Sequence, residues 1–312
     1  MQALIAVADA GSIRAASRLE GLSQAAVTKA LRELEQEVRL PLLLRTASGV
    51  ALTNAGLRLL GHARLVVGQL ARANDDLAVM RGERVGMLSI SVTPWVMLTF
   101  LPRVMQEFRR RMPEVQLEVF EGLTAVALPR LREGTLDFAI GPFTAAMSTH
   151  EFECEPLLAY SSCVIARKGH ACERVDSLHE LLEEDWAVNY SAASYDAFMQ
   201  NLFWQHGASI EPNRLLRTHS IALLFELIRH VGMISYCPEP LLVCESMRGW
   251  VQRFDLAEQF ETSKLSIIGR RNAMRTHAAQ VFVDCLLQEV RRRSRSAARL
   301  DAELFELLQV LF

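Results

Sequence analysis

Side chains that can hydrogen-bond to nucleic-acid bases lie close together near the start of the sequence. Gln24, Ala25, Thr28, Lys29 and Arg32 follow one another at intervals that place them on one side of a helix. A glutamine amide can pair with adenine, and lysine or arginine can reach guanine or a phosphate. The small side chains of Ala25 and Thr28 allow close approach to a base or contact with a thymine methyl group. The chemistry that this face predicts is the reading of a base sequence.

The elements around this face have the pattern that such reading requires. Ser23 suits an N-cap, and the other face of the helix after it is apolar at Val27, Ala30, Leu31 and Leu34. A shorter helical pattern begins after Ser12 and ends at Gly21, where glycine tolerates a left-handed backbone. Two such helices are typical of a helix-turn-helix, in which the second helix enters the major groove. The alternative is an ordinary helical hairpin with a solvated polar face.

The next segment favours the nucleic-acid interpretation. PLLLRTASGVALT, residues 41–53, consists of two short extended pieces on either side of Ser48 and Gly49. It predicts a β-hairpin wing that carries Arg45, well placed for a phosphate or the minor groove. The formal net charge of the chain is only −2, so any contact with DNA must come from a local patch of this kind.

The run SIRAASRLEGLSQAAVTKALRELEQEVRLPLLLRTASGVALTNAG closely resembles the winged helix-turn-helix of LysR-type transcriptional regulators. It departs from the family pattern at Ala25, where proline is usual, and at Leu43 or Leu44, where phenylalanine is usual. The resemblance implies that Gln24, Ala25, Thr28 and Lys29 face bases, and that Ser23, Arg32 and Arg45 occupy backbone or wing positions. It also implies that the chain begins inside the first helix of the family.

A long helix is predicted to follow the wing. Residues 54–81 contain no proline, Thr53 suits the cap, and Gly82 ends the pattern. About 28 residues at 1.5 Å each give a helix of roughly 42 Å. A coiled-coil repeat fits Leu60, Val67 and Asn74 at one core position and Ala63, Leu70 and Leu77 at the other. We expect a dimerisation helix, as the resemblance also implies. The alternative is a helix packed against its own domain.

Beyond Leu88 the pattern changes to alternating strands and helices, which is typical of parallel α/β sheets. TPWVMLTFLPRVMQEFRRRMPEVQLEVFEG, LREGTLDFAIGP and LIRHVGMISYCPEPLL resemble the effector domain of the same family, which is like a periplasmic binding protein. The predicted fold class is therefore α+β and multi-domain. We expect a winged domain at 1–53, a linker helix at 54–86, an effector domain at 87–294 and a helical extension at 295–312. Subdomain I would span 87–160 and 265–294, and subdomain II would span 161–264.

In this fold an effector would bind between the subdomains, beyond the carboxyl ends of strands. The expected polar contacts are residues at strand ends that open helices: Thr93, Ser191, Ser194, His219 and Ser220. Trp95, Phe143 and Tyr190 would supply apolar or aromatic walls. Helix N-termini there would offer N–H groups to a small organic anion. The family resemblance implies a sugar as the other expected class. The alternative for each polar residue is that it only caps a helix.

The sequence gives little support for an enzyme or a metalloprotein. The sequence has no GxSxG, GxGxxG or GxxxxGK motif, and HELLE at 179–183 lacks the second histidine of HExxH. The six cysteines include no CxxC pair, so we expect free thiols and no metal or cofactor; a redox switch between Cys163 and Cys172 is the alternative. We predict a non-enzymatic, cytoplasmic regulator. Its expected partners are promoter or operator DNA, a small-molecule effector, further copies of itself in a dimer or tetramer, and RNA polymerase, with no membrane. The alternative is a small-molecule-binding protein or enzyme of the same fold without a role on DNA.

Overall fold

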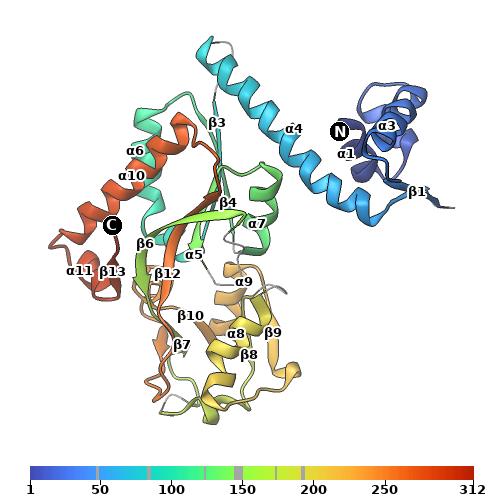
Figure 1. Cartoon of the computed structure of the whole chain (residues 1–312). Coiled ribbons are helices and arrows are strands. Elements are labelled where there is room, and N and C mark those ends of the chain that lie inside the picture. The colour runs from blue at the N-terminus through green and yellow to red at the C-terminus, as the bar shows by residue number, and fades with distance from the viewer. Residues whose placement is uncertain (47–48, 83–85, 123, 144–149, 173, 191–193) are drawn as a thin grey trace. The chain divides into compact units, whose positions relative to one another are not determined.

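The computed structural model describes residues 1–46, 49–82, 86–122, 124–143, 150–172, 174–190 and 194–312. The chain forms two compact units (Figure 1). The first comprises Met1–Gly86 with Pro129–Thr135, and the second comprises Met87–Leu128 with Leu136–Phe312. Among the described residues, none of the helices combines the length and the apolar character that crossing a membrane requires.

The first unit begins with three short helices and a two-stranded hairpin: α1 (Gln2–Ala10), α2 (Ile13–Leu19), α3 (Gln24–Val38), β1 (Leu43–Thr46) and β2 (Gly49–Leu52). The predicted caps are confirmed, because Ser12 accepts a hydrogen bond from the Ala15 N–H and Ser23 accepts one from the Ala26 N–H. Gly21 has the left-handed φ of 65° that lets the chain turn between α2 and α3. The helix-turn-helix and wing therefore form as the local signals predict.

The core of this unit orients α3. Val27 and Leu31 of its apolar stripe are buried beside Leu4, Val7 and other side chains of α1 and α2. With that stripe turned inward, the polar face of α3 must point to solvent. The hydrophobic pattern of the sequence thus decides which side of α3 is available to a partner.

Helix α4 (Asn54–Met80) follows the wing and matches the long helix that the sequence predicts (Figure 1). Gly56 makes its start possible, because a Cβ at this position would lie 2.1 Å from the Leu42 carbonyl oxygen. Leu60 is buried in the core of the winged domain and Ala63 is fully buried, whereas Leu70 and Leu77 are exposed by 62% and 51%. The predicted coiled-coil repeat is therefore wrong for its first turn, where the side chains already pack within their own domain. The exposed leucines of the repeat, Leu70 and Leu77, lie further along α4.

The second unit is built on a six-stranded sheet with the order β13-β6-β12-β5-β3-β4. Its strands are β3 (Met87–Val92), β4 (Gln116–Glu121), β5 (Phe138–Pro142), β6 (Phe152–Tyr160), β12 (Ser263–Arg270) and β13 (Leu308–Val310). Strand β3 pairs in parallel with β4 and β5, as alternating strands and helices predict. Strand β12 is antiparallel to β5 and β6, so the sheet is mixed rather than wholly parallel.

Helices link and cover these strands: α5 (Pro94–Thr99), α6 (Leu101–Arg111), α7 (Thr124–Glu133), α10 (His277–Ser294) and α11 (Arg299–Glu306). Helices α6 and α10 lie side by side, and the rings of Phe108 and Phe282 meet between them at 5.3 Å (Figure 1). Phe138 of β5 packs on the same Phe282 ring, at 5.9 Å. These contacts hold the helical layer against the sheet.

The segment between β6 and β12 forms smaller sheets around a second core that includes Trp186, Leu202 and Phe203. Its sheets have the orders β10-β7-β11 and β8-β9. The strands are β7 (Ser162–Arg167), β8 (Trp186–Val188), β9 (Leu215–Arg217), β10 (Ser235–Pro238) and β11 (Val251–Arg253). Helices α8 (Tyr195–Leu202) and α9 (Ile221–Glu226) accompany them, with short 3-10 turns η1 (Leu178–Leu181), η3 (Trp204–His206), η4 (Pro212–Arg214) and η6 (Glu239–Val243). Helix α9 continues as a π-helical turn, η5 (Leu227–Val231).

The C-terminal segment corrects one prediction. Residues 295–312 were expected to be helical, but α11 ends at Glu306 and Leu308–Val310 form strand β13. Strand β13 pairs antiparallel with β6, with Leu308 opposite Tyr160. The helical leucine spacing does not produce a helix after Leu307, because the residues that follow pair with β6 as a strand.

Candidate DNA-contacting surface and effector junction

The exposed face of α3 forms an open hollow of about 520 Å³. Its lining comprises Gln24, Ala25, Thr28, Lys29, Arg32, Glu33 and Gln36. The structure thus places on one face the five α3 residues that the sequence predicts to contact DNA: Gln24, Ala25, Thr28, Lys29 and Arg32. Glu33 and Gln36 lie on the same surface and were missed, although their spacing of one helical turn from Lys29 and Arg32 was available as a signal.

Local hydrogen bonds arrange this face. The Ser23 hydroxyl caps α3, and the Thr28 hydroxyl donates to the Gln24 carbonyl at 2.8 Å. The Lys29 ammonium lies 3.7 Å from the Glu33 carboxylate, with 78% and 64% of the two side chains exposed. Such an exposed pair contributes little to stability and leaves the lysine available to another anion. The face therefore presents amide, hydroxyl and cationic groups to solvent.

The wing is tied to α3 by a carboxylate that the sequence does not mark as functional. Glu35 Oε1 accepts hydrogen bonds from the backbone N–H groups of Leu42 and Leu43, at 2.7 and 3.2 Å. Arg45 lies in β1 opposite Val50, and its side chain is outside the part of the chain that the structure describes. Glu35 thus positions the strand that carries Arg45 relative to the recognition face.

In the second unit, Thr93 directly follows β3 at the point where three parallel strands end. Its backbone N–H donates to the Ile140 carbonyl of β5, and Val92 lies opposite Glu121 of β4. The Thr93 side chain makes no capping bond to α5 although it is buried. Thr93 therefore occupies the N-cap position of α5 without capping the helix through its side chain. Phe143 follows the end of β5 at the same edge of the sheet.

A second group of strand ends carries His219 and Ser220. Strands β8 and β9 are parallel, and Val188 lies opposite Arg217 at their carboxyl ends. Tyr190 follows β8, and the Arg217 guanidinium lies 5.6 Å from the centre of its ring. Ser220 caps α9 by accepting a hydrogen bond from the Leu223 N–H. His219 and Ser220 are both exposed.

One hydrogen bond joins the two groups of strand ends. Glu121 Oε1 accepts the N–H of Ile221, the first residue of α9, at 3.3 Å. Because Glu121 is the partner of Val92, this bond brings Thr93 and the His219–Ser220 pair to one locus. We call the set Thr93, Glu121, His219, Ser220 and Ile221 the effector junction. Sequence reasoning missed Glu121, since a glutamate ending an exposed strand carries no signal of its own.

The remaining predicted residues divide into three cases. Ser194 precedes α8 without capping it, and Ser191 lies outside the described residues. Trp95 is 1% exposed, and its ring packs 5.2 Å from Tyr160 and 6.2 Å from Phe100 in the core. Trp95 is therefore a core residue rather than a wall of an open site, because the turn after Thr93 directs it inward.

Comparisons with known proteins agree with this architecture. Residues 1–57 match the family described as bacterial regulatory helix-turn-helix protein, lysR family, and residues 81–291 match the LysR substrate binding domain. The HTH-type transcriptional regulator TdcA of Escherichia coli is 27% identical over 228 residues, which cover 73% of this chain and 72% of that protein.

Solved structures share the fold over nearly the whole chain. Full-length OxyR from Pseudomonas aeruginosa aligns with a TM-score of 0.61 at 16% identity, covering 91% of this chain and 92% of that one. Full-length CbnR in complex with its target DNA aligns with a TM-score of 0.59 at 20% identity, covering 92% and 98%. The two family matches together span most of the sequence, with the helix-turn-helix and effector domain in the order found here. The chain therefore belongs to the LysR family of DNA-binding transcriptional regulators with a C-terminal effector-binding domain.

Proposed function

We propose that the α3 face reads the operator and that a small molecule at the effector junction controls this reading. The observation that carries the first part is the hollow lined by Gln24, Thr28, Lys29 and Arg32. These side chains offer donors and acceptors to base edges in the major groove, and Arg45 of the wing would contact the backbone or minor groove. Ser23 at the start of α3 would contact a phosphate.

The effector in this proposal is a small organic anion or a sugar. Thr93, His219 and Ser220 supply hydroxyl and imidazole groups, and Ser191 and Ser194 belong to the proposed set through their place between β8 and α8. The N–H groups at the start of α9 favour an anion. Glu121 occupies one of them, so an anionic effector would have to displace its carboxylate.

The second half of α4 is the proposed dimer contact. Leu70 and Leu77 are exposed apolar side chains on this helix, and exposed Asn74 lies between them. Pairing of two such helices would bury the leucines and set two α3 helices on half-sites of one operator. The proposal also includes formation of a tetramer, movement of the winged domains when the effector binds, and altered recruitment of RNA polymerase. It assigns the protein no catalytic role and places it in the bacterial cytoplasm.

The test uses fluorescence anisotropy of the full chain with DNA from upstream of its own gene, beside scrambled DNA, over a salt series. We expect tighter binding to the native fragment that weakens steeply with salt. Lys29→Ala removes a base-reaching cation from an exposed position and should cut the specific affinity by about tenfold or more. Thr28→Ala should reduce the difference in affinity between the native and the scrambled DNA.

The control is the thermal unfolding of each variant, which should stay close to that of the parent protein because both positions lie on the solvent side of α3. Retention of full preference for the native fragment by both variants would contradict the assignment of the α3 face. The same assay then screens small carboxylates, sulfonates and sugars for a change in affinity.

A further inference from the structure

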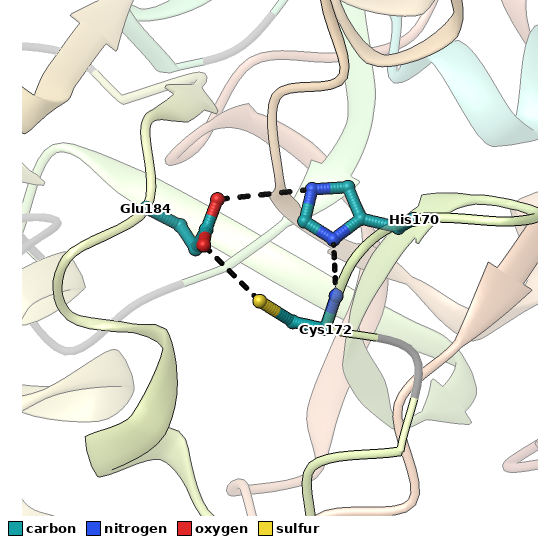
Figure 2. Close-up of side chains that lie close together, drawn as sticks. All are labelled: His170, Cys172 and Glu184. Carbon is teal, nitrogen blue, oxygen red and sulfur yellow. Dashed lines mark hydrogen bonds and ion pairs between the residues drawn. The ribbon is translucent and has the colours of Figure 1, made fainter.

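Three side chains with metal-ligand chemistry meet in the segment between β6 and β12 (Figure 2). His170 and Cys172 lie in the turn after β7, and Glu184 lies just before β8. One nitrogen of His170, the Cys172 sulfur and one Glu184 oxygen are within 4.8 Å of one another. No sequence motif indicates this group, because Cys172 and Glu184 are twelve positions apart and only the fold brings them together.

The three side chains already converge through hydrogen bonds. The Cys172 thiol donates to Glu184 Oε1 at 3.1 Å. His170 Nε2 lies 3.9 Å from the other carboxylate oxygen of Glu184, as the dashed lines in Figure 2 show. A carboxylate thus faces both a thiol and an imidazole.

The surroundings hold the histidine in place. His170 is 7% exposed, and its ring packs edge-on against Phe254 with the ring centres 6.3 Å apart. Its Nε2 lies 2.9 Å from the Gly232 carbonyl oxygen, and its Nδ1 accepts the backbone N–H of Cys172 at 3.2 Å. A backbone carbonyl that receives one ring N–H is the usual outer-shell partner of a metal-binding histidine.

The charges near the cluster are suited to a cation. Glu184 stands between Glu183 and Asp185 in the sequence. The guanidinium of Arg214 forms ion pairs with these two neighbours, at 3.6 Å to Glu183 and 3.1 Å to Asp185. The arginine therefore pairs with the flanking carboxylates, while Glu184 faces Cys172 and His170. The side chain of Glu184 is 34% exposed.

We propose that His170, Cys172 and Glu184 bind a divalent transition metal of borderline softness, with zinc as the best fit. Thiolate and imidazole select zinc over magnesium or calcium, and three protein ligands leave a fourth position for water. In a tetrahedral zinc site the ligand atoms are about 3.3–3.6 Å apart. The Cys172 sulfur and Glu184 Oε1 are 3.1 Å apart, and all three ligand atoms lie within 4.8 Å of one another, so small side-chain movements suffice.

Binding has a defined proton balance. The Cys172 thiol donates its proton to Glu184, so the metal must displace this proton into solvent. Binding through either ring nitrogen of His170 also replaces one of the ring's present hydrogen bonds. Affinity should therefore increase with pH as proton release becomes easier.

The test is a titration of the tag-free full chain with zinc in competition with a chromophoric chelator, and with cobalt(II) as a spectroscopic probe. We expect one equivalent of zinc per chain and a thiolate-to-cobalt charge-transfer band in the near ultraviolet. Cys172→Ser keeps a small donor beside Glu184 but removes the thiolate, so it should abolish the band and weaken zinc binding at least about tenfold. Glu184→Gln should also weaken zinc binding.

Matched controls come from the same chain. Cys154→Ser removes another partly accessible thiol and Glu183→Gln removes the adjacent carboxylate, and both should leave zinc affinity and the cobalt band unchanged. Thermal unfolding in chelator establishes that each variant is folded, and added zinc should raise the midpoint of the parent but not of Cys172→Ser. Equal zinc affinity in parent and Cys172→Ser, or a cobalt spectrum without the thiolate band, would overturn the proposal.

Discussion

Lys29 and Glu33 form an exposed pair one turn apart on α3, and both line the hollow of the recognition face. Phosphates of DNA would compete with Glu33 for the ammonium of Lys29, and the Glu33 carboxylate would repel them. In the proposed function, Glu33 would therefore limit how tightly the face holds any DNA, while the bases that Gln24 and Lys29 meet would decide which DNA is preferred. Affinity and specificity would then be controlled by different side chains of the same helix.

Glu33→Gln should strengthen binding to native and scrambled DNA alike, by about three- to tenfold at low salt, because one repulsive charge is removed. The ratio of the two affinities should stay the same, and both affinities should depend more steeply on salt. Anisotropy over a salt series measures all three effects. Glu37→Gln, a change of the same charge on α3 at a residue that does not line the hollow, is the control. An effect confined to native DNA would show that Glu33 contacts a base instead.

At the scale of elements, the start of α9 is where the proposed effector would act on the fold. Its first N–H is held by Glu121 at the end of β4, and its continuation η5 ends at Gly232, whose carbonyl contacts His170. A ligand that displaces Glu121 would exchange a bond between two elements of the second unit for its own contacts. An effector bound at the effector junction would therefore replace the hydrogen bond that joins β4 to α9.

Glu121→Gln distinguishes the two classes of effector. A neutral side chain competes less well for the α9 N–H groups, so anionic effectors should bind about two- to fivefold tighter. A sugar that donates a hydroxyl to the Glu121 carboxylate should bind more weakly. Isothermal titration calorimetry of the full chain measures both, with Glu226→Gln near the other end of α9 as the control. Unchanged affinity for every effector found in the screen would remove Glu121 from the site.

Local signals in the sequence predict the first unit well, because they act over a few residues. Ser12 and Ser23 cap their helices as predicted, and the hydrophobic stripe of α3 is turned inward. Strands β9, β11 and β13 were not foreseen, since each is three residues long and depends on a partner distant in the sequence. Glu35 and Glu121 act through single bonds to backbone N–H groups, which no spacing of residue types reveals.

At the scale of the whole molecule, Arg293 joins three helices of the second unit. From α10 it pairs with Asp301 of α11, donates to the Thr99 carbonyl at 2.7 Å, and lies 5.2 Å from the centre of the Phe100 ring. The side chains of Arg293 and Asp301 are only 14% and 10% exposed. Loss of one partner would leave the other charge nearly buried, which is strongly destabilising.

Asp301→Asn should lower the free energy of unfolding by about 3 kcal/mol at neutral pH. Burial raises the pKa of the Asp301 carboxyl, but hydrogen bonds from Ser296 and Arg293 and the nearby arginine charges outweigh it, so the pKa lies below its ordinary value of 3.8. A carboxyl with a lowered folded-state pKa contributes stability above its unfolded pKa, and that contribution is lost as the pH falls through the folded one. The difference between variant and parent should therefore shrink in acid.

Urea denaturation at neutral pH and again below the ordinary aspartate pKa measures this change. Asp255→Asn is the matched control, because Asp255 pairs with Arg253 at 3.1 Å but is 87% exposed, so its loss should have little effect at either pH. Equal destabilisation by Asp301→Asn at both pH values would show that packing, rather than the charge of Asp301, holds α11 to α10.

The order of strands in the six-stranded sheet also determines when it can be completed during synthesis. Strands β5 and β6 emerge from the ribosome early, yet both wait for β12 to pair between them, with Ile267 opposite Ile140 and Glu155. The segment between β6 and β12 has a core of its own and can fold during that interval. The outer edge of β6 stays open longer still, until residues 308–310 arrive as β13. The nascent chain thus exposes an unpaired strand edge while residues 161–307 are made, about half of its translation, and chaperones acting on it should bind there first.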